Sequence, residues 1–332
     1  MSLTLYSILF MSKNITNKER YRDYCDENKH IPLFMQAWWL DAVCINESWD
    51  VILGKKNDQI IAIWVYHFVN KLGFKIIIQP QLTQTSGIWI DYPKGLSKNE
   101  IVYFDNEVMK DLINQFQKQR FSYYDQNFHH SITNWLPLYW NGFKQTTRYT
   151  YQILDISDPL KCFENFSYAK KKQIKKAQKN ITINYDLSAE SFYEQLEQNF
   201  KALGQNVYYQ KDLFLKLFEV CQKRNQGCII SAHDEQMCFH AALFIVWDDN
   251  STYNLISAIN PAFRSSGASS LIVWEALQFS SNKSKIFDFE GSMNKNIEKS
   301  FRQFGTVQVP YFRIIKFNSL YFKILHQLHK WI

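Results

Sequence analysis

The stretch between positions 251 and 278, STYNLISAINPAFRSSGASSLIVWEALQ, constrains the fold most, because a strand pattern changes into a helix pattern across one short loop. Residues 251–259 are rich in aromatic, aliphatic and β-branched side chains and predict a half-buried strand. Pro261 has no N–H to donate, so the strand must end there. From Ser269 onward the apolar residues recur at helical spacing, which predicts a helix that begins directly after the loop.

The loop between this strand and this helix is built from small residues apart from one arginine. It consists of Arg264, Ser265, Ser266, Gly267, Ala268 and Ser269. The first turn of a helix offers unpaired N–H groups and the positive end of the helix dipole, so such a loop can hold a phosphate. An ordinary strand-to-helix turn with a serine N-cap explains the same residues.

The length of 332 residues is comfortable for two domains, and we expect them at 1–145 and 146–332. The aromatic content of 17% falls largely in strand-like runs and favours broad sheets over helical bundles. No segment approaches the ~20 apolar residues that cross a bilayer. The first residues show no charged leader and no cleavage site of a signal peptide, so we expect a cytoplasmic protein. Met11 is an alternative first residue.

Six cysteines and eight histidines offer no convincing metal site or disulfide framework. No two cysteines form a C-x-x-C pair, so buried thiols are the expectation. His129 and His130 adjoin, and His326 and His329 share a predicted helix face, but neither pair has a third ligand near it.

The positive charge of the chain is concentrated in one segment, YAKKKQIKKAQKN, which holds six lysines and no acid. The net charge is +7, so without these six it would be +1, which argues against a general nucleic-acid-binding protein. Ile174, Ala177 and Ile181 are spaced to anchor one side of a helix and leave the lysines in solvent. The lysines then either form a solvated face or contact a polyanionic substrate.

The order of predicted elements is clearest in the second half of the chain. After the lysine-rich helix it reads strand, two helices, a three-strand meander, the small-residue loop with its helix, a strand, a helix and a final strand. The first half reads as mixed helices and strands, with turns at 56–58 and 71–73 and a helix over 99–119.

This order resembles the GNAT acyltransferase superfamily, in which a loop with the pattern Arg/Gln-x-x-Gly-x-Gly/Ala opens a helix after a splayed strand. Arg264 and Gly267 match that pattern, and Ser269 replaces its last small residue. The segments SYAKKKQIKKAQKNITINY and KIFDFEGSMNKNIEKSFRQFG are similar to regions of the Fem-type peptidyltransferases. The resemblance implies an α/β fold of mixed sheets, with two acyl-CoA N-acyltransferase (GNAT-like) domains in tandem and a cleft between them.

Acyl transfer to an amine requires a held donor, a stabilised oxyanion and a proton acceptor. Glu290 is the candidate base, because it ends the strand KIFDFE where an open sheet meets its ligand. The alternative is that Glu290 caps the next helix or pairs with a lysine. Backbone N–H groups at 257–260 are expected at the oxyanion. Arg302 is a candidate for stabilising the oxyanion or for binding a carboxylate of the acceptor. Tyr253 is a candidate for donating a proton to the leaving group.

The leading hypothesis is an N-acyltransferase that moves an acetyl, acyl or aminoacyl group from acyl-CoA or aminoacyl-tRNA to a small-molecule or peptide amine. The loop 264–269 would bind the donor's phosphate. Lys171, Lys172 and Lys175 would contact tRNA or a nucleotide-linked precursor. The alternative is a non-catalytic protein of the same fold that recognises a polyanionic partner. No metal is expected in either case.

Overall fold

The computed structural model describes residues 15–329, and the expectations about the start of the chain and Met11 fall outside them. The helices are α1 (Asn17–Glu27), α2 (Ala37–Val43), α3 (Lys98–Phe116), α4 (Leu136–Trp140), α5 (Pro159–Glu164), α6 (Tyr168–Ala177), α7 (Ala189–Ala202), α8 (Lys211–Lys223), α9 (Ala268–Ser280), α10 (Lys295–Arg302) and α11 (Leu320–His329). The strands are β1 (Trp49–Lys56), β2 (Gln59–Lys71), β3 (Phe74–Ile78), β4 (Gly87–Ile90), β5 (Tyr123–Asn127), β6 (Lys144–Ile153), β7 (Ile181–Asn184), β8 (Gly227–Asp234), β9 (Phe239–Trp247), β10 (Ser251–Ile259), β11 (Ile286–Asp288) and β12 (Val307–Phe317).

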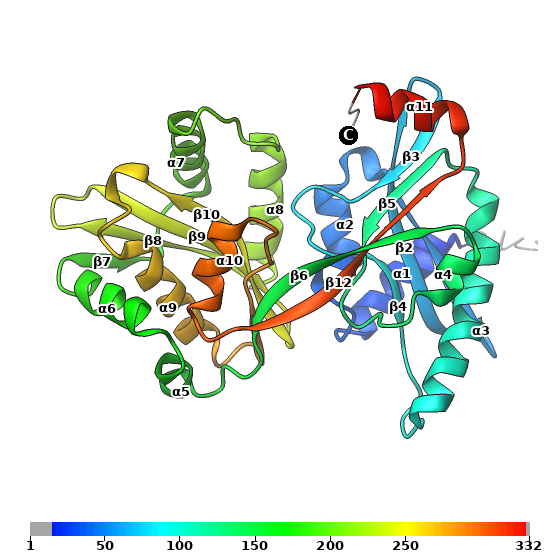
Figure 1. Cartoon of the computed structure of the whole chain (residues 1–332), viewed down its shortest axis with the longest axis horizontal. Helices are drawn as coiled ribbons and strands as arrows, with labels where there is room; N and C mark the ends of the chain where they lie inside the picture. Colours follow the sequence, from blue (N-terminus) through cyan, green and yellow to red (C-terminus); the bar gives the residue numbers. More distant parts are fainter. Residues whose placement is uncertain (1–14, 330–332) are drawn as a thin grey trace, which may run out of the picture.

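One mixed sheet runs through both halves of the chain in the order β1-β2-β3-β5-β12-β6-β11-β10-β9-β8-β7, and β4 pairs with β2 beside this path. β6 and β12 are the antiparallel pair that joins the two lobes (Figure 1). The predicted order of the second half, from β7 through α7, α8, β8–β10, α9, β11 and α10 to β12, is confirmed. The predicted turns at 56–58 and 71–73 are also present, with Asn57, Asp58, Leu72 and Gly73 in left-handed backbone.

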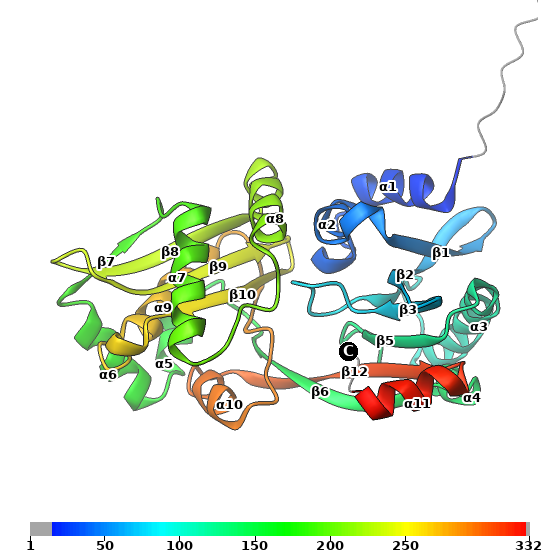
Figure 2. The same cartoon turned by 90° about the horizontal axis from the view of Figure 1, so that it is seen from above.

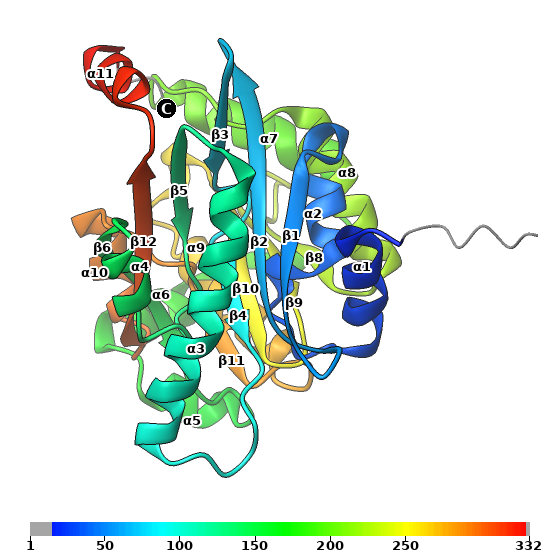
Figure 3. The same cartoon turned by 90° about the vertical axis from the view of Figure 1, so that its right-hand side faces the viewer.

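Helices cover both faces of the sheet and bury a core on each. On one face, α1, α2, α7 and α8 enclose a cluster that includes Phe34, Trp39, Phe192 and Phe214 and spans the two lobes (Figure 2). The opposite face of the second lobe is covered by α5, α6 and α9. The opposite face of the first lobe is covered by α3 and α4 (Figure 3). β9 is buried along its whole length between such layers, and all of its residues except His240 are apolar.

The end of the chain returns to the first lobe. Residues 313–317 of β12 pair with β5, and Phe322 of α11 packs against Tyr123 with ring centroids 5.6 Å apart. The division at 145/146 stays a prediction; that position lies inside β6, and β12 contacts both lobes.

All six cysteines lie in the described part of the chain as free thiols, and four of them are buried. Within residues 15–329, no three His, Cys, Asp or Glu side chains are grouped so as to hold a metal ion. No helix of that part is long and apolar enough to span a membrane.

Candidate active site

The strand that precedes the small-residue loop parts from its neighbour in the sheet. β10 and β11 are parallel and pair only at Ser251, Thr252 and Tyr253, after which β10 continues to Ile259 alongside β9 alone. The register with β9 shifts between Asn254 and Ile256, so a β-bulge occurs at Leu255. A bulged residue is left out of the regular ladder, and such residues often border functional sites. The predicted splay is therefore present, and it begins one residue before the bulge.

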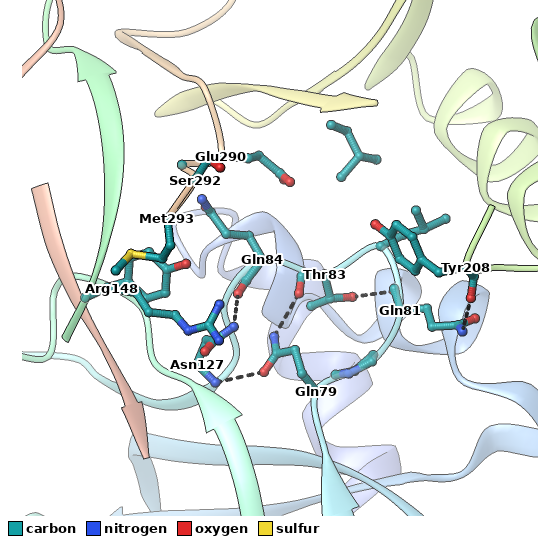
Figure 4. Close-up of a pocket in the computed structure, with 15 residues that line it drawn as sticks. Gln79, Gln81, Thr83, Gln84, Asn127, Arg148, Tyr208, Glu290, Ser292 and Met293 are labelled. Atoms are coloured by element: carbon teal, nitrogen blue, oxygen red, sulfur yellow. Dashed lines mark hydrogen bonds between the residues drawn. The ribbon is translucent and has the colours of Figure 1, made fainter. Parts of the chain in front are cut away.

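A cleft of about 380 Å³ opens where the strands part. The first lobe contributes the loop 79–84 and Asn127, and β6 and β12 contribute Arg148 and Tyr311. The second lobe contributes Tyr208, Leu255 and residues 290–293. In Figure 4, Arg148 and Asn127 lie at one end of the cleft, Tyr208 and Gln81 lie at the other, and Glu290 lies above Gln84 between them.

Glu290 is the predicted residue that the structure places in the cleft. Its Oε1 atom is shielded from solvent and has no hydrogen-bond partner within the described residues. Burial, and then the nearby charge of Asp288, raise the pKa of Glu290 well above its ordinary value. Its backbone is left-handed, with φ of 60°, a conformation that is uncommon for glutamate and concentrated at functional sites.

A buried hydrogen-bond network fixes the backbone at Glu290. Asp288 accepts hydrogen bonds from the Thr150 hydroxyl, from Nε2 of Gln152 at 2.7 Å and from the backbone N–H of Glu290 at 2.7 Å. Burial raises the pKa of Asp288, and these donors oppose that rise. Gln84 of the first lobe donates to Thr150 Oγ1 at 3.3 Å, so the network reaches across the cleft.

The first-lobe side of the cleft is a loop whose conformation is held by its own amides. Gln79 Nε2 donates to the Thr83 carbonyl at 3.0 Å, and Gln81 Nε2 donates to the Tyr208 carbonyl at 3.0 Å. Asn127 donates from its backbone to Gln79 Oε1 at 3.0 Å and from Nδ2 to the Gln84 carbonyl at 3.2 Å. The loop is therefore tied both to β5 and to the second lobe.

Arg302 and Tyr253 lie outside the wall of this cleft. Arg302 is exposed on α10 and donates from Nε to Glu298 Oε1 at 2.8 Å, a surface ion pair. Tyr253 is buried on β10 with its ring centroid 4.6 Å from that of Phe34, and it borders a separate cavity of about 370 Å³. Burial raises the pKa of Tyr253 well above its ordinary value, so its phenol stays protonated. Their catalytic roles remain predictions.

The backbone N–H groups expected at the oxyanion, those of residues 257–260, lie beyond the bulge. The segment 256–259 pairs with β9, and the N–H of Asn260 donates to the His240 carbonyl at 3.0 Å. Leu255 itself borders the cleft beside Glu290. Leu255 therefore lines the cleft and residues 257–260 do not, and the oxyanion role of 257–260 stays a prediction.

The small-residue loop does stand at the mouth of α9, with Gly267 as the residue before its first turn. Gly267 has φ of 86°, and a Cβ atom there would come within 2.5 Å of the Gln173 carbonyl oxygen of α6. The close approach that this glycine permits is thus between two parts of the chain. Its conformation is needed for helix packing whether or not a phosphate binds.

The remaining groups of the loop are partly committed to other contacts. The N–H of Ser266 donates to the Phe263 carbonyl, and that of Ala268 donates to Ser266 Oγ at 3.2 Å. The Ser265 carbonyl accepts from Lys176 Nζ at 3.0 Å. A cavity of about 370 Å³ adjoins Ser266, but Asp234 and Glu235 line it together with Lys176. The loop keeps exposed donors at Arg264 and Ser265, while the adjoining cavity does not select for an anion.

The lysine-rich helix α6 departs from the prediction at two positions. Ile174 and Ala177 are buried as expected, but Ile181 begins β7 instead of extending the helix. Lys170 is not in solvent but only 7% exposed, because it shares the spacing i, i+4, i+7 with Ile174 and Ala177. Its Nζ donates to the hydroxyls of Ser270 at 3.2 Å and Ser300 at 3.0 Å.

The three lysines proposed for substrate contact lie toward solvent. Lys172 and Lys175 are exposed, and Lys171 is half-buried with its Nζ donating to the Glu164 carbonyl at 2.7 Å. None of them lines the cleft. A large anionic substrate would have to reach them from outside the cleft.

No protein-family model matches the chain, and no curated protein matches it in sequence. Solved structures do match. FemX is 10% identical, with a TM-score of 0.67 over 94% of this chain and 98% of FemX. A conserved protein of unknown function from Bacteroides thetaiotaomicron is 10% identical, with a TM-score of 0.55 over 85% and 90%. The C-terminal domain of a putative lysylphosphatidylglycerol synthetase from Agrobacterium fabrum is 8% identical, with a TM-score of 0.53 over 94% of both chains. The predicted α/β fold of mixed sheets is thereby confirmed, and it is similar to the fold of FemX. The division into two GNAT-like domains in tandem stays a prediction.

Gly267→Ala should destabilise the protein by about 2–4 kcal/mol, because the new methyl group adds overlap with Gln173 to the ~1–2 kcal/mol of left-handed strain. Gly95→Ala is the matched control, since Gly95 has φ of 83° and open space around it. We expect Gly95→Ala to show the strain alone. Urea unfolding of both variants measures the difference, and equal losses would contradict a packing role for Gly267.

Lys170 should make stability depend on pH in alkaline solution. Burial lowers its pKa from 10.5 to about 8, so between these values the unfolded chain binds the proton and the folded chain does not. The free energy of unfolding therefore gains a contribution that rises from about pH 8 to 10.5. Lys170→Met should lack this rise. Parallel stability curves for wild type and variant over that range would show that the pKa of Lys170 is ordinary.

Proposed function

We propose that this protein is an N-acyltransferase whose reaction takes place in the cleft at Glu290. The observation that carries the proposal is the carboxyl group of Glu290, which stands unpaired at the point where β10 and β11 part. A carboxyl with a buried oxygen that has no hydrogen-bond donor is costly to ionise, and such groups concentrate where a proton must be accepted near neutral pH. The likeness to FemX supports the fold on which the proposal rests.

The transfer would proceed by addition of the acceptor amine to the carbonyl carbon of the activated donor. Glu290 accepts a proton from the amine as the N–C bond forms. The carbonyl oxygen becomes an oxyanion, and the N–H of the bulged Leu255 is the proposed donor to it. The bond from carbon to the leaving group then breaks. The leaving thiolate, or ribose oxygen, takes a proton, and the amide is the product.

The donor is proposed to be acyl-CoA or aminoacyl-tRNA, and different parts of the second lobe support each. The position of loop 264–269 at the start of α9 supports a phosphate of CoA, whereas the exposed Lys172 and Lys175 support a polyanion such as tRNA. The packing of Gly267 beneath α6 and the acids of the adjoining cavity favour the tRNA.

Glu290→Gln should lower kcat/KM for amine acylation by about 10²–10⁴-fold. The wild-type rate should rise with pH through the raised pKa of Glu290, and the variant should lack this limb with the same acceptor. The variant should fold at least as well as the wild type. Because the pKa of Glu290 is higher in the folded protein than in the unfolded chain, ionisation of Glu290 lowers the free energy of unfolding as pH rises above about 4.3, and the glutamine side chain does not ionise.

Glu275→Gln is the control for this change. Burial raises the pKa of Glu275 too, but its side chain belongs to α9 and does not line the cleft. It should retain wild-type activity. Full activity of Glu290→Gln with an unchanged pH profile would show that Glu290 is not the base. Absence of transfer by the wild-type protein from either donor to any amine would leave the non-catalytic alternative.

The double variant Lys172→Glu/Lys175→Glu should identify the donor. If tRNA binds along α6, its dissociation constant should rise, and the slope of log K against log salt should fall by about one unit for each phosphate that a lysine no longer neutralises. Acetyl-CoA binding and thermal stability should change little, since exposed charges contribute little to folding. Calorimetry with both donors on the wild type and the double variant measures these affinities. An unaltered tRNA affinity would mean that the lysines of α6 form a solvated face and do not bind the donor.

A further inference from the structure

Arg148 is a cation of the cleft that sequence patterns did not single out. It lies on β6 opposite Tyr311 of β12, and both residues line the cleft with Glu290 (Figure 4). Its side chain is half-buried, and no carboxylate within the described residues lies in salt-bridge distance of it. By contrast, Arg313, two positions along β12 from Tyr311, is paired with Asp125. Because a guanidinium does not give up its proton in a protein, the cleft carries a permanent uncompensated positive charge.

The cleft that Arg148 lines also holds the side-chain amides of Gln84 and Asn127. Gln84 and Asn127 use their side-chain N–H groups on Thr150 and on the Gln84 backbone carbonyl. Their side-chain oxygens accept from no donor in the part of the chain that is described. Figure 4 shows Asn127 beside the guanidinium of Arg148, and the Gln84 side chain between Asn127 and Glu290. The cleft thus offers one cationic fork from β6 and two free carbonyl acceptors from the first lobe.

The charges of the cleft are therefore separated between its two sides. Among the residues that line it, Arg148 is the cation and Glu290 the acid, and the others are neutral. A ligand that fits this distribution has an amine, which Glu290 can deprotonate, and an anionic group, which Arg148 can bind. The free amide oxygens can accept from an ammonium or a peptide N–H.

The single arginine favours a carboxylate as the anionic group. A guanidinium binds a carboxylate in a bidentate fork and balances its single charge. A phosphate dianion would need a second cation, and no lysine lines the cleft. The cleft volume of about 380 Å³ lies at the small end of ligand pockets, which suits a compact ligand.

We propose that the acceptor is a free amino acid and that Arg148 binds its carboxylate while Glu290 accepts a proton from its amine. The proposal rests on the proposed function in that the same site supplies the base. Arg148 thus binds the carboxylate of the acceptor, a role that the sequence suggested for Arg302. The guanidinium of Arg302 is paired with Glu298 outside the cleft.

The test compares acceptors that differ only in the anionic group. L-alanine, L-alaninamide, ethylamine and 1-aminoethylphosphonate are assayed with acetyl-CoA and with alanyl-tRNA, and their binding is followed by calorimetry without donor. Wild type should bind and acylate L-alanine in preference to L-alaninamide and ethylamine. Arg148→Met should raise KM and the dissociation constant for L-alanine about 10–100-fold, the value of one charge-assisted hydrogen bond, and leave those for L-alaninamide unchanged.

Two further variants separate binding from folding. Arg148→Lys keeps the charge without the fork and should recover part of the preference for L-alanine. Arg20→Met removes an exposed arginine of α1 and should leave the preference intact.

Each outcome bears on one of the two proposals. Transfer to amines without any preference for the carboxylate, or a preference that survives Arg148→Met, would overturn the inference and leave the acyltransferase standing. Tighter binding of 1-aminoethylphosphonate than of L-alanine would replace the carboxylate by a phosphate and overturn it too. Carboxylate-selective binding that Arg148→Met abolishes, without transfer from either donor, would support the inference and contradict the proposed function. Absence of binding by all four compounds would contradict the inference.

Discussion

β10 and β11 run parallel for three residue pairs and then separate, and the architecture of the site follows from that separation. β10 continues along β9 through a bulge at Leu255, while the chain after β11 turns sharply at Glu290 and Gly291 toward β6. Gly291 can make this turn because it has no Cβ atom, which would lie 2.2 Å from the Tyr149 carbonyl oxygen. The parted strands leave an opening in the sheet, and the Glu290 carboxyl borders it without a partner among the described residues.

The first lobe closes this opening from the other side. Its loop 79–84 is fixed by amide hydrogen bonds, and two of them, Gln81 to the Tyr208 carbonyl and Gln84 to Thr150, cross to the second lobe and to β6. The Thr150 hydroxyl donates to Asp288, and Asp288 accepts from the backbone N–H of Glu290. The acid and the arginine of the cleft are therefore held by one connected set of strands and hydrogen bonds. Such preorganisation places charges before a substrate arrives, which lowers the cost of reorganisation during reaction.

Features with a local sequence signal were predictable, and those made by tertiary contact were not. The strand, loop and helix of 251–278, the element order after 181 and Glu290 follow from periodicity and position along the chain. The spacing of Lys170 with Ile174 and Ala177 could have shown that this lysine is buried, and the Thr16–Glu19 capping box could have shown α1. Arg148, Gln84 and Asn127 carry no such signal, because strands from both lobes must assemble before these side chains face Glu290.

Glu290 holds a carboxyl whose Oε1 atom is buried in the cleft without a partner among the described residues, poised to accept a proton. A carbon-13 NMR titration of glutamate side-chain carboxyls tests it most directly, with Glu290 assigned as the resonance that is missing in Glu290→Gln. The account predicts a titration midpoint well above the ordinary ~4.3, because burial and the Asp288 charge both oppose ionisation. A midpoint at the ordinary value would mean that water or a cation reaches this carboxyl, and would contradict the account.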